Sequence, residues 1–193
     1  MTLQRINCIN SLKDNKIENH YGINVQEISF LNKFNLRINN KNSDLVKKCG
    51  KILNTILPIK PNTYNKSDSI NIIWLGPNEW LITNNKEKDL FIQLRNELGD
   101  LDASVTDVSE NRTVIRISGN KIFTLLSKFL VLDLDKNLSN ESSCAQTLFV
   151  KVPILLVRNF KENETPEIDI YTNRSHANYI YNLIVDGTVN LDF

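Results

Sequence analysis

Few side chains in this sequence could carry catalytic chemistry. Only two histidines occur, His20 and His176, so a hydrolase relay or a metal cluster would have to be built around one of them. His20 lies in a stretch without hydrophobic periodicity, and His176 lies in the first turn of an expected helix. Neither has neighbours suited to catalysis or metal binding, so we expect His176 to be solvated and assign no chemistry to His20.

Three other side chains are candidates by residue type. Asp133 and Asp135 could act in acid–base catalysis or bind a divalent cation, yet the further ligands that a cation requires are missing. Ser109 has no Gly-x-Ser-x-Gly frame and no nearby base. We expect an Asp-rich turn and a turn hydroxyl, and the sequence predicts no catalytic, metal-binding or cofactor-binding residue.

The composition argues against a nucleotide or nucleic-acid site. The six glycines form neither a Gly-x-Gly-x-x-Gly run nor a phosphate loop, so we expect this chain alone to bind no cofactor. With 23 Lys and Arg against 22 Asp and Glu, the formal net charge is +1. This charge gives no sign of electrostatic attraction to a nucleic acid or an anionic membrane. We expect neither as a partner.

Three residues are candidates for contacts with another protein. Trp74 and Trp80 flank a turn at Gly76, so we expect at least one to face outward as an interface anchor, with a core aromatic as the alternative. Arg174, just before the last expected helix, is either a surface charge or a partner contact. The candidate partner contacts are therefore Trp74, Trp80 and Arg174.

Length and cysteine usage indicate one compact protein from a reducing compartment. The 193 residues suffice for one well-buried core, but not comfortably for two independent domains. Cys8, Cys49 and Cys144 are odd in number and far apart, which fits neither a disulfide framework nor a zinc site. Residues 1–10 carry no signal-peptide run, and no stretch approaches the ~20 apolar residues of a membrane helix. We expect a cytoplasmic protein.

Hydrophobic periodicity predicts alternating strands and helices. In the first half we expect a strand or hairpin over 25–38, a helix capped by Asn42 or Ser43 and stopped by Pro58, a polar loop over 62–68, a hairpin of strands 70–75 and 79–83, and a helix over 90–98 ended by Gly99. In the second half we expect a strand within 105–119, a helix with Ile122 and Phe129 in its buried stripe, a run over 145–158 that Pro153 divides or moves to an edge, a strand containing Ile168 and Ile170, and a helix capped by Ser175 and closed by Gly187. This order predicts an α+β fold of antiparallel sheets with packed helices.

The predicted domain organisation is one domain with short extensions. Residues 1–24 lack sustained periodicity, which is typical of a solvent-exposed or partner-docked arm. We expect a single domain over 25–187, made of halves at about 25–100 and 101–187, and a tail over 188–193. The arm is expected to belong to an interface.

A set of short motifs resembles a known family. Part of the set is similar to the "Asp-x-Ser, strand, Gly, helix, Asp" signature of the aminomethyltransferase (glycine-cleavage T-protein) superfamily: Thr106-Asp107-Val108-Ser109, Val114-Ile115-Arg116-Ile117-Ser118-Gly119, the Leu125-Leu126 helix and Leu132-Asp133. Three more stretches complete it: Trp74-Leu75-Gly76-Pro77-Asn78-Glu79-Trp80-Leu81, Cys144-Ala145-Gln146-Thr147 and Arg174-Ser175. Together, over roughly Ile70 to Asp186, they resemble the sarcosine oxidase gamma-subunit family.

The resemblance implies a fold like the folate-binding domain of the T-protein and a place in a heterotetrameric complex. Such a complex oxidatively demethylates sarcosine to glycine and passes the one-carbon unit to tetrahydrofolate. Its alpha, beta and delta subunits would be the partners, and FAD, FMN, NAD, tetrahydrofolate and zinc would lie on those other subunits.

One difference from the aminomethyltransferase enzymes of this superfamily implies a non-catalytic subunit. Aminomethyltransferases have a Gly-rich turn and an essential Asp after the strand that corresponds to 144–147, whereas Leu148 to Arg158 contains neither Gly nor an acid. A chain without that carboxylate is not expected to turn over alone. Two alternatives stay open: a stand-alone folate-binding protein, and the small subunit of a related N-methyl amino acid dehydrogenase. A scaffold subunit is expected to expose apolar surface.

Overall fold

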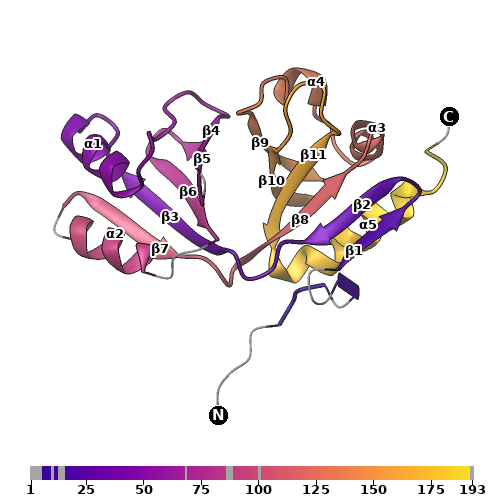
Figure 1. Cartoon of the computed structure of the whole chain (residues 1–193), viewed down its shortest axis with the longest axis horizontal. Helices are drawn as coiled ribbons and strands as arrows, with labels where there is room; N and C mark the ends of the chain where they lie inside the picture. Colours follow the sequence, from indigo (N-terminus) through magenta and orange to yellow (C-terminus); the bar gives the residue numbers. More distant parts are fainter. Residues whose placement is uncertain are drawn as a thin grey trace, which may run out of the picture. The chain divides into compact units, whose positions relative to one another are not determined.

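The chain folds into two compact units. The computed structural model describes residues 6–9, 11–12, 16–67, 69–85, 89–99 and 101–191. Unit 1 comprises Met1–Phe30 with Glu110–Phe193, and unit 2 comprises Leu31–Ser109. Unit 2 is therefore an insertion between the two segments of unit 1, and the chain passes from one unit to the other twice (Figure 1).

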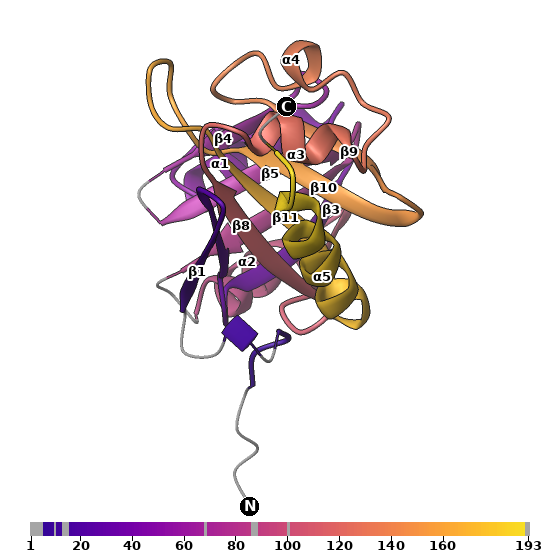
Figure 2. The same ribbon diagram turned by 90° about the vertical axis from the view of Figure 1, so that its right-hand side faces the viewer.

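Unit 1 is built on a six-stranded sheet in which all neighbouring strands are antiparallel. In spatial order its strands are β1 (Ile17–His20), β2 (Ile23–Glu27), β8 (Arg112–Ser118), β11 (Glu167–Asn173), β10 (Val152–Arg158) and β9 (Cys144–Phe149). Its helices are α3 (Ile122–Ser127), α4 (Leu134–Asn137), the 3-10 turn η2 (Arg174–His176) and α5 (Ala177–Thr188). Apolar side chains of the sheet and these helices form one core, and Figure 2 shows α5 lying along the sheet.

Unit 2 repeats this plan with a five-stranded antiparallel sheet and a core of its own. Its strands in spatial order are β4 (Tyr64–Lys66), β5 (Ile70–Gly76), β6 (Glu79–Asn84), β3 (Asn32–Ile38) and β7 (Ala103–Asp107), and its helices are α1 (Ser43–Ile52) and α2 (Leu90–Leu98). The predicted α+β class with antiparallel sheets and packed helices is confirmed.

The division into units differs from the predicted halves, 25–100 and 101–187. The expected element over 25–38 is two strands, β2 and β3, that belong to different sheets, and the run over 105–119 likewise contains β7 and β8. The first boundary between the two units follows Phe30, whose φ of 59° lies in the left-handed region and ends the extended conformation. Alternating apolar residues continue on both sides of each boundary, so hydrophobic periodicity alone does not reveal where one unit ends and the other begins.

The predicted N-terminal arm, residues 1–24, is largely part of unit 1 where the structure describes it. It contains β1 and the start of β2, and Ile9 and Leu12 are fully buried. The buried carboxylate of Glu27 accepts backbone N–H groups of Cys8 (3.0 Å) and Ile9 (2.9 Å), and the hydroxyl of Thr113 donates to it at 2.6 Å. Long-range hydrogen bonds, which leave no periodic pattern, fix this segment.

Both ends of the predicted α1 can be compared with the structure. Asn42 caps the helix as expected, because its Oδ1 accepts the N–H of Leu45 at 3.1 Å. The helix ends at Ile52, however, well before Pro58. The following Asn54 has a φ of 49°, and Ile56, which the predicted helix would contain, is 75% exposed.

The last helix also begins and ends differently from the prediction. Ser175 lies inside η2 and does not cap α5, which starts at Ala177. Gly187 lies within α5 and does not terminate it. A Cβ there would be 2.6 Å from the ring of Phe129, so close packing explains the glycine.

Two further segments differ from their predicted structure. The expected polar loop over 62–68 contains β4, which pairs with β5. The run over 145–158 is divided as predicted, but by a turn at Val150 (φ 58°) rather than at Pro153. Pro153 is tolerated inside β10 because β10 pairs there with β9 alone.

Parts of the predicted extensions lie outside the described residues. These are 1–5, 10 and 13–15 of the arm, 68 of the polar loop and 192–193 of the tail. Of the remaining tail, Thr188 ends α5 and Leu191 is buried in the unit 1 core.

Replacing Glu27 by Gln tests how the N-terminal segment is held. We expect Glu27→Gln to lower the free energy of unfolding by about 2–3 kcal/mol. The glutamine side chain keeps only one acceptor oxygen, which is uncharged, and its NH2 group would face groups that donate hydrogen bonds to Glu27. Urea denaturation of the full chain measures this change, and Glu162→Gln at an exposed position is the matched control. Equal stability of the two variants would show that Glu27 does not anchor the segment.

Candidate interaction surface

The histidines are not part of a cluster suited to catalysis among the described residues. His20 ends β1, where its Nε2 lies 3.4 Å from a carboxylate oxygen of Glu18. His176 ends η2 and contacts the neighbouring hydroxyl of Ser175 at 3.5 Å. Within the part of the chain that the structure describes, no group of three or more His, Cys, Asp or Glu side chains could hold a metal ion.

The other candidate side chains bind the backbone. Asp133 Oδ1 accepts the N–H of Lys136 at 3.0 Å and thereby caps α4, whose first turn contains Asp135. Ser109 Oγ accepts the N–H of Lys33 at 2.9 Å, and Asp107 Oδ1 accepts the N–H of Ser109 at 2.8 Å. The Asp-x-Ser motif thus joins the end of β7 to β3, which is a structural role.

Cys49 is a core residue. Its side chain is fully buried in unit 2, and this burial raises the pKa of the thiol to about 11. Since only the thiolate is a strong nucleophile, Cys49 is not suited to covalent chemistry at neutral pH.

The two tryptophans pack on the same side of the unit 2 sheet. Trp80 is 1% exposed, and its Nε1–H donates to the carbonyl of Pro58 at 2.8 Å. Trp80 is therefore a core residue, and its assignment as a partner contact was wrong. Trp74, its cross-strand neighbour, is half-buried against the same core, and its contact with a partner stays a prediction.

Arg174 binds within unit 1. One guanidinium nitrogen forms an ion pair with Glu110, and Nη2 donates to the carbonyl of Ile6 at 3.2 Å. Nearby, Asn178 Nδ2 donates to the carbonyl of Cys8 at 2.9 Å. Arg174 therefore helps to hold the N-terminal segment of its own unit, and a partner contact of this residue stays a prediction.

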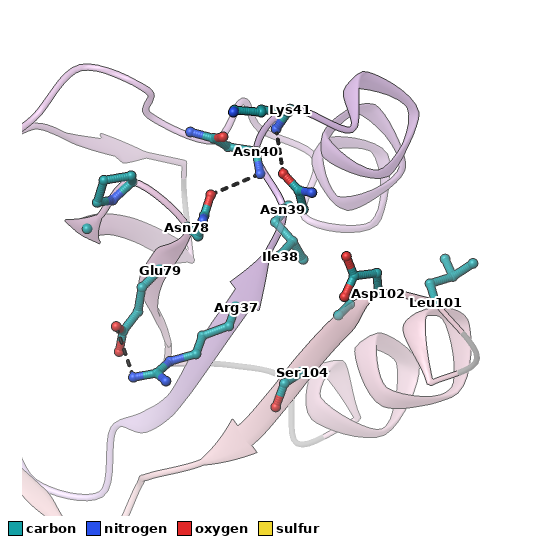
Figure 3. Close-up of a pocket in the computed structure, with 13 residues that line it drawn as sticks. Arg37, Ile38, Asn39, Asn40, Lys41, Asn78, Glu79, Leu101, Asp102 and Ser104 are labelled. Atoms are coloured by element: carbon teal, nitrogen blue, oxygen red, sulfur yellow. Dashed lines mark hydrogen bonds and ion pairs between the residues drawn. The ribbon is translucent and has the colours of Figure 1, made fainter.

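A surface hollow lies at one end of the unit 2 sheet (Figure 3). It measures about 910 Å³ and is formed by three segments, 37–41, 76–79 and 101–104. Figure 3 shows Asn40 and Lys41 on one side and Leu101 and Asp102 on another, with Arg37 and Glu79 below. We call this feature the unit 2 hollow.

Hydrogen bonds fix the walls of the unit 2 hollow. The side-chain oxygen of Asn78 accepts the N–H of Asn40 at 3.1 Å, and the carbonyl of Asn78 accepts the N–H of Ile38 at 3.2 Å. On the sheet, Glu79 accepts bonds from Arg37 (3.1 Å) and Asn35 (2.7 Å). The segments were expected as separate turns and strands, and only the pairing of β6 with β3 and of β3 with β7 brings them together.

The fold places the chain in a recognised structural class. A chain in the structure of the glycine cleavage aminomethyltransferase T from Bartonella henselae matches it with a TM-score of 0.61 and 10% identity, over 86% of this chain and 46% of the other. A chain in the heterotetrameric sarcosine oxidase of Corynebacterium sp. U-96, solved with pyrrole 2-carboxylate, matches with a TM-score of 0.82 and 20% identity, over 95% of this chain and 92% of the other. At these identities the two likenesses establish the T-protein-like fold.

The sequence defines the family more narrowly. Residues 41–190 match the "Sarcosine oxidase, gamma subunit family", so the chain belongs to this family. The sarcosine oxidase subunit gamma of Corynebacterium sp. (strain P-1) is 30% identical over 92 residues, which cover 48% of this chain and 45% of the relative. The chain thus spans about half the length of this curated relative. The family predicted from the motifs is confirmed.

Strands β9 and β10 contribute apolar side chains to the unit 1 core. β9 and β10 carry no carboxylate. Ile154 and Leu156 of β10 pack into the unit 1 core, and Arg158 at its end donates to the carbonyls of Leu138 and Ser139 at 2.8 and 3.1 Å. In addition, none of the described helices is long and apolar enough to cross a membrane.

Truncating Trp80 distinguishes a core residue from an interface anchor. We expect Trp80→Ala to lower the free energy of unfolding by about 3–5 kcal/mol, because it leaves a large cavity and removes the bond to Pro58. Trp74→Ala at the half-buried neighbouring position is the control and should cost less. Urea denaturation of the purified chain measures both. If Trp80→Ala kept full stability and lost only the capacity to assemble, Trp80 would be an anchor after all.

Proposed function

We propose that this chain is the gamma subunit of a heterotetrameric sarcosine oxidase and supports assembly of the complex without catalysing a step itself. The observation that carries the proposal is the family match over residues 41–190. In this proposal the complex oxidatively demethylates sarcosine to glycine and transfers the one-carbon unit to tetrahydrofolate. The alpha, beta and delta subunits are the partners.

The distribution of chemical groups supports a non-catalytic role. Oxidation of an N-methyl amine requires an electron acceptor such as a flavin, and the protein must bind and orient it. This chain has no glycine-rich nucleotide loop, and β9 and β10 have no carboxylate for the transfer step. We therefore assign FAD, FMN, NAD, tetrahydrofolate and zinc to the other subunits.

Exposed apolar side chains support a role in assembly. In unit 1, Val131, Leu148 and Val150 are exposed, and the N–H of Val150 donates to the carbonyl of Phe129 at 3.0 Å. In unit 2, Ile56 and Ile59 are 75% and 69% exposed. A partner that covers these apolar side chains would remove them from water, which favours association.

Co-expression with the large-subunit genes tests this proposal. A tag on this chain should recover the other subunits and a flavin spectrum, and sarcosine should bleach the flavin because its oxidation reduces the cofactor. The isolated chain, which serves as the control, should be colourless and inactive.

Other outcomes would contradict the proposal. Bleaching by another N-methyl amino acid, with sarcosine inert, would assign the chain to a related dehydrogenase. A lone monomer that binds tetrahydrofolate would assign it to stand-alone folate binding.

A further inference from the structure

A short N-terminal segment of unit 1, which we call the strap, is held like a bound peptide. The strap comprises the described residues 6–9 and 11–12, and it adds Ile9 and Leu12 to the unit 1 core. It has hydrogen bonds of its own, because Leu12 N–H donates to the carbonyl of Ile9 at 3.2 Å and Asn7 Nδ2 donates to the carbonyl of Leu12 at 2.9 Å. The strap is therefore a small folded piece with two apolar anchors.

The carboxylate of Glu27 binds two successive N–H groups of the strap. It accepts the N–H of Cys8 at 3.0 Å and the N–H of Ile9 at 2.9 Å. Glu27 is 1% exposed, and the hydroxyl of Thr113 donates to the same carboxylate at 2.6 Å. Because these two residues lie on the paired strands β2 and β8, the sheet itself positions this acceptor for the strap.

Two side chains at the start of the last helical segment bind carbonyl groups of the strap. Arg174 Nη2 donates to the carbonyl of Ile6 at 3.2 Å, and Asn178 Nδ2 donates to the carbonyl of Cys8 at 2.9 Å. We call Glu27, Arg174 and Asn178, with the core pockets that hold the two anchors, the strap site. Peptide-binding proteins use the same combination, in which backbone bonds give affinity and pockets for a few side chains give specificity.

The position of the strap favours local opening. Most of the buried side chains of unit 1 lie on its paired strands and on α3 and α5, which pack against one another in the same core. Terminal segments with few buried side chains open at a lower free energy than the free energy at which the whole domain unfolds.

We propose that the strap site is a peptide-binding site whose occupant is the strap itself, and that the strap leaves and re-enters this site while unit 1 stays folded. The ligand that the site takes is a short peptide, bound through its backbone, with apolar side chains three positions apart as in Ile9 and Leu12. This inference concerns unit 1 alone and does not depend on the proposed function.

Cys8 in the strap reports the opening. Burial raises the pKa of its thiol, so Cys8 reacts slowly with an alkylating reagent while the strap is bound, because the thiolate is the reactive form. Cys49 and Cys144 are 0% and 1% exposed, so they become accessible when the unit around them unfolds. Alkylation of the full chain, followed at each cysteine by mass spectrometry, therefore separates opening of the strap from unfolding.

The proposal predicts fast alkylation of Cys8 that depends on its contacts with the strap site. Relative to the rates in the urea-unfolded chain, Cys8 should react at least about 100-fold faster than Cys49 and Cys144. Asn178→Ala removes one bond to the strap and should raise the Cys8 rate about fivefold. The matched control Asn182→Ala changes an exposed residue of the same helix and should leave the rate unchanged, and urea unfolding midpoints show that both variants fold.

A free peptide tests the site itself. A synthetic peptide of residues 6–12 with Cys8→Ser should occupy the opened site and accelerate alkylation of Cys8 in proportion to its concentration, whereas the same peptide with Ile9→Asp should have no effect. Equal protection of all three cysteines would overturn the proposal, because the strap would then open only when unit 1 unfolds. A Cys8 rate that neither Asn178→Ala nor the peptide changes would overturn it as well, since the thiol would then react with the strap in place.

Discussion

Two antiparallel strand pairings, β2 with β8 and β3 with β7, are the constraint on which the rest of the fold depends. The chain leaves unit 1 after β2 and returns before β8, so both ends of the inserted unit 2 are held by these pairings. In unit 2, Lys33 N–H donates to Ser109 Oγ and Val108 N–H donates to the carbonyl of Lys33. In unit 1, the hydroxyl of Thr113 donates to Glu27. The Asp-x-Ser motif thus secures the strands at an insertion point.

Sequence patterns correctly predicted the features that depend on interactions between residues close together in the chain. The cap at Asn42, the hairpin of β5 and β6, and the bounds of α2 follow from residue spacing and turn chemistry, and the structure confirms them. The division into units could not be predicted, because strand alternation continues through both insertion points. The order in the N-terminal segment was missed for a related reason: Ile9 and Leu12 are isolated apolar residues, and the carboxylate that anchors them is Glu27, far along the chain.

Motifs in the sequence identified the family, but they did not show which contacts individual side chains make. The motif set identified the family, whereas the positions of Trp80 and Arg174 depend on partners that are distant in sequence, Pro58 and Ile6. Strand register would have indicated that Trp74 and Trp80 share a face, because they are direct cross-strand neighbours. The unit 2 hollow had no sequence signal, since its three segments meet only through strand pairing.

Native mass spectrometry of the complex recovered through a tag on this chain tests the central claim most directly. The account predicts one dominant species that contains a single copy of this 22.2 kDa chain together with three different partner chains and bound flavin. Loss of this chain on mild dissociation should leave the cofactors with the other subunits. A species that contains only copies of this chain, or a cofactor that dissociates together with it, would contradict the account.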